Sequence, residues 1–441
     1  MSFDAIRRVA DAVLFEGYML YPYRASAPKN QLRFQFGVLA PRVWSEAGGP
    51  EAWWMETQCL VEKDVDVAIE LKLRFLHIRR RRVEVERGGR FVPVDSIEVD
   101  GRLLMPWDEG EIREIDAAAC LDGDLGPRIT TFDIAGAIEI EPVEASDGSL
   151  SVRLVRTQEV LHGTIRIGAE RTGDPRLLRL RVRVECLSAC EPGLTRDDAL
   201  ARSFLGAHLM LAVRGGAFVS LLDPPAWART AASSCESTRT YPVLAGEPGT
   251  RVLVLSAPII LYDHPRIAPE SPGDLFDATE IDEILTLRTM TLTDDEKRQS
   301  RATDPRVAAI LDRIEALSPE QMGRMHGAIR ELAMVEASPS RVPPQTHETP
   351  RREIRIGSDL VGPGTRVRLR SGARRTDAQD MFLDGLTATV ERVERDVDDR
   401  DCLAVTVDAD PAAELLRWHG RYLYFYPDEV EVLEPRRERG P

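Results

Sequence analysis

Alternation of apolar and polar side chains with a period of two is the feature that most constrains the fold of this chain. It is clearest in residues 32–38, 65–73 and 178–184. A strand with this pattern turns one face to a core and the other to water, which is typical of antiparallel sheets. Gly- and Asp-containing turn signals separate such runs. Residues 1–290 are therefore predicted to form a large antiparallel β-sandwich-like region, either one domain or two packed β units.

Helical signals are few in this region and dominate the next one. Helices are expected near residues 3–15 and 196–207, and a short helical hairpin or arm over 291–336. Thr293 and Glu296 have the spacing of a capping box. An apolar stripe at three- and four-residue spacing follows between residues 307 and 317.

The remaining chain divides into a linker and a second β domain. Residues 337–351 are proline-rich and have no apolar period, which predicts an extended linker. Residues 352–435 contain three cleanly alternating runs within about 80 residues, and this pattern favours a small SH3-like β-barrel. The whole chain is therefore predicted to be mainly β.

Composition excludes several classes of function. The 58 basic and 73 acidic side chains give a net charge of -15, which disfavours general nucleic-acid binding. No apolar run reaches the ~20 residues that span a bilayer. Six scattered cysteines do not make a disulfide framework, so we expect reduced thiols and a cytoplasmic location. The run Arg79–Arg82 is interpreted as a charged sheet face paired with Glu84 and Glu86.

Signatures of the common catalytic classes are missing. The sequence has no phosphate-binding G-x-x-x-x-G-K-[ST] loop, no H-E-x-x-H zinc motif and no G-x-S-x-G nucleophile turn. Cys186 and Cys190 form a C-x-x-x-C pair, but no second pair has the spacing of a zinc site. No cofactor is predicted, and whether the chain catalyses a reaction is left open.

Two aromatic stretches are candidate interaction surfaces. Tyrosine and arginine are typical interface anchors because they combine a large contact area with a polar tip. Small β-barrels also bind peptides along an exposed strand face, although packing of these rings into the core explains them equally well. The candidates are Tyr21, Tyr23, Arg24, Lys29 and Asn30 in the loop 18–30, and Trp418, Tyr422 and Tyr424 near the C-terminus.

The segment 261–283 is the candidate metal site. Prolines fix its path, and one histidine lies among many carboxylates, which are ligands for hard metal ions. The alternative is a rigid acidic connector or a contact surface for a basic partner. The candidate ligands are Asp263, His264, Glu270, Asp274 and Asp277.

These stretches also carry a family resemblance. Residues 21–30 with 36–39, residues 261–283, and residues 380–383, 410–415 and 420–422 resemble bacterial proteins encoded beside nickel–iron hydrogenases of the actinobacterial, high-affinity type. The resemblance implies a context of hydrogenase maturation, assembly or partner binding. No catalytic residue can be carried over from it.

Three functions remain open from the sequence. The first is a non-catalytic accessory protein that binds a protein partner, with hydrogenase subunits as the partner that the resemblance implies. The second is a metal-dependent enzyme that uses the cluster around His264. The third is a structural scaffold that self-associates through its β domains.

Overall fold

The chain forms two compact units. The computed structural model describes residues 3–31, 33–121, 125–146, 151–267, 273, 275–276, 282–317, 353–357, 359–370, 383, 385–395, 401–410, 413, 417 and 422–434. Unit 1 contains Met1–Thr279 and Asp294–Arg313, and unit 2 contains Glu280–Thr293 and Ile314–Pro441. The segment 291–336, expected as one arm, thus contributes to both units, and the expected linker 337–351 lies outside the described residues. The boundaries at 290 and 352 stay predictions.

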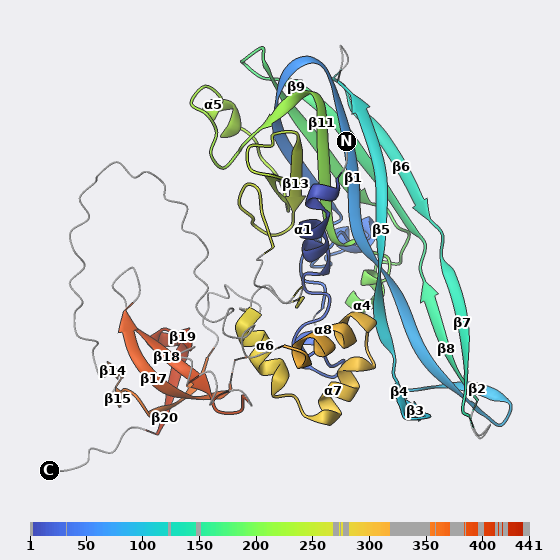
Figure 1. Ribbon diagram of the computed structural model, residues 1–441, viewed down its shortest axis with the longest axis vertical. Helices are drawn as coiled ribbons and strands as arrows, with labels where there is room; N and C mark the ends of the chain where they lie inside the picture. The colour runs from blue at the N-terminus through green and yellow to red at the C-terminus, as the bar shows by residue number, and fades with distance from the viewer. Residues whose placement is uncertain are drawn as a thin grey trace. The chain divides into compact units, whose positions relative to one another are not determined.

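Unit 1 is mainly antiparallel β-structure, as the alternation predicts (Figure 1). In its described part, eleven strands form one sheet, and β3 and β4 pair separately. The strands are β1 (Trp54–Arg87), β2 (Arg90–Val94), β3 (Ile97–Val99), β4 (Arg102–Leu104), β5 (Trp107–Cys120), β6 (Arg128–Ile134), β7 (Ala137–Glu144), β8 (Ser151–Gln158), β9 (Leu161–Arg171), β10 (Leu177–Cys186), β11 (Leu205–Val219), β12 (Tyr241–Leu244) and β13 (Leu253–Ala257).

The strand β1 organises the whole sheet. Its 34 residues would extend roughly 110 Å at about 3.3 Å per residue. No single neighbour is that long, so β1 changes partners along its length. On one side it pairs in turn with β10, β5 and β2, and on the other with β11 and then β8. A register shift between Lys63 and Ala68 marks an irregularity in the pairing with β11.

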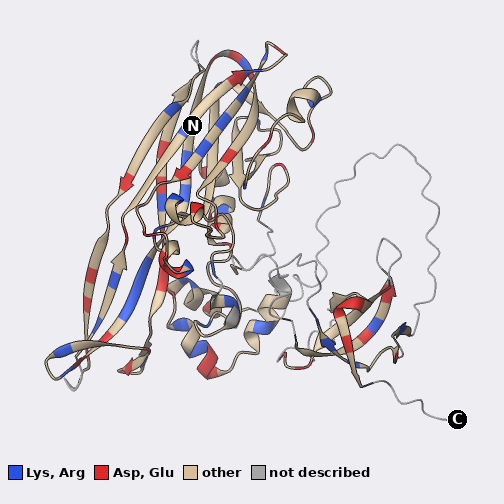
Figure 2. Ribbon diagram, turned by 180° about the vertical axis from the view of Figure 1, so that it is seen from behind, with Lys and Arg blue, Asp and Glu red and all other residues tan. Residues whose placement is uncertain are grey.

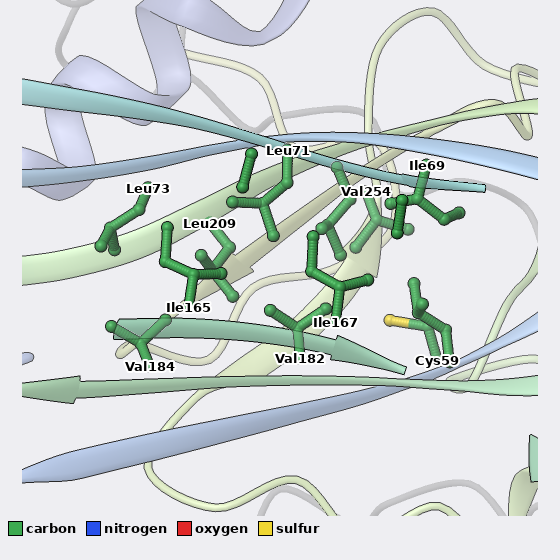
Figure 3. Packing of buried hydrophobic residues seen from close by; sticks show 14 of the residues in the cluster. Cys59, Ile69, Leu71, Leu73, Ile165, Ile167, Val182, Val184, Leu209 and Val254 are labelled. Carbon is green, nitrogen blue, oxygen red and sulfur yellow. The ribbon is translucent and has the colours of Figure 1, made fainter. Parts of the chain in front are cut away.

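The sheet curls so that strands far apart in its order share one core. The order β1-β10-β9-β6 places two strands between β1 and β6. Nevertheless Phe75 of β1 lies 6.3 Å from Phe132 of β6, measured between ring centroids, and Phe204 stacks on Phe75 at 4.5 Å. Figure 3 shows aliphatic side chains from β1, β9, β10, β11 and β13 meeting in this interior. Burial of these apolar surfaces is the main stabilising contribution in unit 1.

A helix covers part of the outer face of the sheet. In α1 (Asp4–Phe15), Ile6, Ala10 and Val13 pack on Met210 and Leu255. The side chains that alternate with these on β11 and β13 belong to the inner core, so both strands are buried on both faces. This explains why β11 reads as a continuous apolar run.

The same helix also covers a buried charge. The Arg74 side chain is 2% exposed, and its Nη2 lies 2.5 Å from Oδ1 of Asp11 in α1. Its Nε lies 3.3 Å from Oε2 of Glu114 in β5. Lys72 and Arg7 also contact Glu114. A buried arginine is tolerated when carboxylates surround it in this way.

Two predictions for this region are wrong in detail. The helix expected over 196–207 ends at Leu200, and Leu205 already begins β11, because this run is buried on both faces of a sheet. Residues 33–38 form no strand, although alternation predicted one over 32–38. Phe34 and Gly37 have φ of 59° and 60°, which an extended strand excludes. The helix expected over 3–15 is confirmed as α1.

The remaining described helices are short. They are α2 (Pro28–Gln31), α3 (Arg42–Glu46), α4 (Arg196–Leu200), α5 (Arg229–Ala232), α6 (Asp282–Met290), α7 (Asp294–Arg301) and α8 (Pro305–Glu315). Helices in 294–315 agree with the expected helical arm, whose residues 318–336 lie outside the described part. No helix among the described residues is long and apolar enough to cross a membrane.

Unit 2 contains a five-stranded antiparallel sheet in the order β19-β18-β17-β16-β20. Its core includes Val367, Val390, Leu403 and Val405, all fully buried. The predicted small β domain is therefore observed, and its likeness to SH3 barrels stays a prediction. The elements are β14 (Ile354–Ile356), β15 (Asp359–Val361), β16 (Arg366–Leu369), β17 (Thr387–Arg395), β18 (Asp401–Val407), β19 (Leu423–Phe425), the 3-10 helix η1 (Pro427–Glu429) and β20 (Val430–Glu434).

The close approach at Gly163 gives a test of the curled core. A Cβ at this position would lie 2.4 Å from Phe132 and 2.7 Å from Phe204. We expect Gly163→Ala to lower the free energy of unfolding by about 1–3 kcal/mol, because the aromatic rings must move. Gly173→Ala is the matched control, since a Cβ there meets nothing within 4 Å. Equal stabilities in urea denaturation would contradict the packing.

A buried histidine predicts how stability depends on pH. His208 is fully buried opposite Arg74, and burial lowers the pKa of its imidazole to about 4. The unfolded chain binds this proton below about pH 6.5, whereas the folded chain does so only below about 4. The contribution of neutral His208 is therefore complete above about pH 6.5 and is lost as the pH falls towards 4.

Thermal melting across this range measures the effect. We expect the melting temperature to fall less steeply between pH 6.5 and 4 in His208→Asn than in the parent chain. His162→Asn is the control, because the His162 side chain is 43% exposed. The prediction fails if both variants keep the slope of the parent protein.

Candidate functional sites

The loop 18–30, predicted as an interaction surface, is mostly built into the protein. Tyr23 is fully buried, and Asn30 is 6% exposed. The Asn30 amide accepts from the Leu20 N–H at 2.8 Å and donates to the carbonyls of Leu20 and Arg24, both at 2.9 Å. These two candidates therefore form the framework of the loop.

The other candidates in this loop are half-buried. They are Tyr21, Arg24 and Lys29. Arg24 pairs with Glu296 of α7 at 3.1 Å. The roles predicted for these three side chains in partner binding remain predictions.

The loop 18–30 contacts the apolar residues Leu275 and Phe276 of the acidic segment 261–283. The Tyr23 hydroxyl donates to the Leu275 carbonyl at 3.0 Å. Phe276 lies 5.4 Å from Phe15 and 6.2 Å from Tyr18, measured between ring centroids. The contact between these two segments is therefore aromatic and backbone-mediated.

The candidate metal ligands divide into two groups. Asp263 accepts from the Ser220 hydroxyl at 2.5 Å and from the Leu244 N–H at 2.8 Å. The His264 N–H donates to the Leu244 carbonyl at 2.7 Å. Both residues thus tie the segment to β12. Glu270, Asp274 and Asp277 lie outside the described residues.

The described residues contain no group of three or more His, Cys, Asp or Glu side chains suited to a metal ion. Only two of the five predicted ligands, Asp263 and His264, are among the described residues. The metal-dependent enzyme therefore stays an untested alternative.

The C-terminal aromatic candidates are partly described. Tyr424 is 55% exposed on β19, and the Arg392 guanidinium lies 5.3 Å from the Tyr422 ring centroid. Burial and the nearby Glu394 raise the pKa of the Tyr424 phenol. Trp418 lies outside the described residues. An exposed tyrosine beside an arginine fits the predicted interaction face, which stays a prediction.

A buried polar network lies under the loop. The Tyr18 hydroxyl donates to Oδ2 of Asp304 at 2.6 Å and accepts from the Gly110 N–H at 3.0 Å. The other Asp304 oxygen accepts from the Arg306 N–H at 2.7 Å, which caps the start of α8. Burial, together with the Asp304 charge, raises the pKa of the Tyr18 phenol well above its usual range.

The arginines of β1 have other partners than the sequence suggested. Glu84 pairs with Arg153 of β8 rather than with the run Arg79–Arg82. Arg79 and Arg81 pair instead with Glu109 of β5, because the neighbouring strand places this carboxylate across from them. Basic and acidic residues both lie along these long strands (Figure 2).

Arg33 is the side chain that the sequence analysis missed. It is 6% exposed, and its guanidinium carbon lies 3.7 Å from the centre of the Trp107 ring. Nη2 donates to the Asp108 carbonyl at 2.5 Å. Burial lowers the pKa of Arg33 to about 10, so the group is still charged at pH 7. Its position in an alternating run gave no sign of this role, because the run is not a strand.

A cavity of about 380 Å³ lies beside Arg33 and the loop, and we call it the arginine pocket. Its walls come from four separate segments of the sequence (25–34, 80–82, 106–108 and 196–200), so residue spacing alone did not reveal it. Its lining residues include five arginines and two aspartates. They are Arg33, Arg80, Arg81, Arg82, Arg196, Asp108 and Asp197.

An outer edge of the sheet is exposed along β6 and β7. Among the described strands, β6 pairs only with β9 and β7 only with β8 (Figure 1). Ile129 in β6 is 52% exposed, and Ile138 and Ile140 in β7 are 75% and 53% exposed. Ile138 and Ile140 share one face of β7. This edge offers unpaired backbone groups beside apolar side chains.

The Tyr18 network gives a testable contribution to stability. Tyr18→Phe removes a hydroxyl that serves two buried groups, the Asp304 carboxylate and the Gly110 N–H. We expect the free energy of unfolding to fall by about 1–3 kcal/mol, because these partners stay buried without it. Tyr241→Phe is the control, since Tyr241 is 46% exposed. Equal urea midpoints for the two variants would contradict this role.

No protein-family model matches the chain, and no curated protein matches it in sequence. The resemblance to proteins encoded beside hydrogenases therefore stays a prediction, and function has to be inferred from the surfaces described above.

Proposed function

We propose that the protein is a non-catalytic accessory protein that binds a partner protein along the edge formed by β6 and β7. The partner proposed is a nickel–iron hydrogenase subunit during maturation or assembly, as the sequence resemblance implies. The proposed location is the cytoplasm, which the six free thiols support because such compartments keep cysteines reduced.

The exposed edge is the single observation that carries this proposal. Long apolar edge strands invite pairing with other chains, and native proteins normally shorten, charge or cover them. On β7, Ile138 and Ile140 remain exposed on one face. Glu139, which lies between them, pairs with Arg79, and Glu141, which follows Ile140, pairs with Arg156.

The edge also indicates what kind of partner segment fits. An added strand bonds to the free backbone groups and places alternate side chains against the isoleucines. We therefore propose an extended partner segment with apolar residues at every second position. Backbone pairing supplies affinity, and the isoleucine face supplies selectivity.

Co-expression with the hydrogenase large and small subunits tests this proposal. We expect the full chain to co-purify with a subunit, and the double variant Ile138→Lys with Ile140→Lys to raise the Kd at least about tenfold. Lysines on the edge disfavour strand addition by charge and lost apolar contact. Ile260→Lys is the matched control, because Ile260 is 77% exposed, close to the 75% of Ile138.

Two results would contradict the proposal. The first is no co-purification with either subunit, and the second is equal binding by the edge variant and the control. Mass photometry of the chain alone tests the scaffold alternative. A dimer that the edge substitutions dissociate would assign this edge to self-association instead.

A further inference from the structure

We propose that the arginine pocket binds a small organic anion that carries a carboxylate or phosphate group next to an apolar portion. This site is separate from the β6–β7 edge and does not depend on the proposed partner. Four features support it: the charge balance of the lining, the unpaired donors, the apolar wall and the position of the loop.

The first feature is a pair of arginines, Arg33 and Arg82, that form no ion pair with a described carboxylate. Three of the lining arginines are neutralised by ion pairs: Arg80 with Asp108 and Asp198, Arg81 with Glu109, and Arg196 with Glu51. Within the described part of the chain, neither Arg33 nor Arg82 has an ion pair. Asp197 also lines the pocket and Arg80 has two carboxylate partners, so the charge left for a ligand is centred on the guanidinium groups of Arg33 and Arg82.

The second feature is a pair of buried donors with no acceptor. Across the residues that the structure describes, Arg33 Nε and Trp107 Nε1 are buried and lack a hydrogen-bond partner. Buried donors of this kind are rare in native proteins, because each costs free energy when it is not satisfied. The side chains that carry these two donors line the pocket, and a guanidinium binds carboxylate and phosphate oxygens especially well.

The third feature is the apolar part of the lining. Phe34, Pro106, Trp107 and Leu200 line the same cavity as the arginines. A volume of about 380 Å³ falls within the range of small-molecule sites and exceeds what a bare inorganic ion needs. The ligand is therefore expected to combine an anionic head with a small apolar body.

The fourth feature is the position of the loop 18–30 at the pocket. Ala25 and Asn30 of this loop line the cavity together with Arg80 and Arg82 of β1. An anion held between these segments would link the loop to the sheet. Binding is therefore expected to stabilise the folded protein, because a ligand that binds only the native state raises its melting temperature.

Thermal melting and calorimetry of the full chain test the site with four probes. The probes are inorganic phosphate, acetate, benzoate and phenyl phosphate, and neutral benzamide is the control ligand. We expect saturable binding of benzoate or phenyl phosphate in about 0.15 M salt, which screens weak surface attraction. The stronger of the two identifies the head group as carboxylate or phosphate.

Two variants and one matched control locate the binding. Arg82→Gln changes an exposed residue and is expected to raise the Kd about tenfold. Arg33→Lys keeps the charge but loses the planar donor, and is expected to abolish measurable binding. Arg87→Gln is the control, because Arg87 is also an exposed arginine of β1 but does not line the pocket.

Two outcomes would overturn the inference. One is the absence of any melting shift with the four anions up to about 10 mM, where a site with a Kd of about 1 mM is mostly filled. The other is equal weakening by Arg82→Gln and Arg87→Gln. Arg82 is exposed, so Arg82→Gln does not alter the core, and the test holds even if Arg33→Lys fails to fold.

Discussion

Unit 1 depends on one constraint, which is that β1 is longer than any strand beside it and therefore needs several neighbours. A strand of 34 residues is longer than each strand that pairs with it, so the sheet is assembled from successive pairings along β1. Curling follows from this requirement together with the right-handed twist of strands. The curl brings Phe75, Phe132 and Phe204 together and closes the apolar interior.

Buried arginines also hold unit 1 together. Arg74 is covered by α1 and held by carboxylates, and Arg81 donates to the carbonyls of Ala302 and Thr303. Each of these guanidinium groups joins segments that are distant in the sequence. Arg33 differs, because it stacks on Trp107, lines a cavity and has no ion pair among the described residues. This difference supports the binding role that we propose for Arg33.

The sequence predicted the fold class better than the sites, for a physical reason. Alternation reports which face of a strand is buried, so it located the region of β1 around Leu71 and the strand β10 correctly. It failed at residues 32–38, because positive φ at Phe34 is set by tertiary packing and leaves no periodic signal. The helix expected to continue to residue 207 failed because strands buried on both faces lose their alternation.

The sites were harder to predict because they are assembled across the chain. The composition of the loop 18–30 suggested an interface, whereas Tyr23 and Asn30 bond within the protein. The arginine pocket combines Arg33, Arg82 and Arg196, whose proximity follows only from the strand order and from the position of α4. The exposure of Ile138 likewise depends on β7 lying at an edge, which the sequence does not encode locally.

Asp304 completes the buried polar network of unit 1, and it lies 286 residues after Tyr18 in the sequence. At the usual 5–20 residues per second of synthesis, roughly 15–60 s separate these two residues as the chain is made. During that interval the Tyr18 hydroxyl has no carboxylate, and Arg81 has no carbonyls from residues 302 and 303. The nascent chain can form its sheet first, but completing the buried network has to wait for a segment that follows an excursion into the other unit.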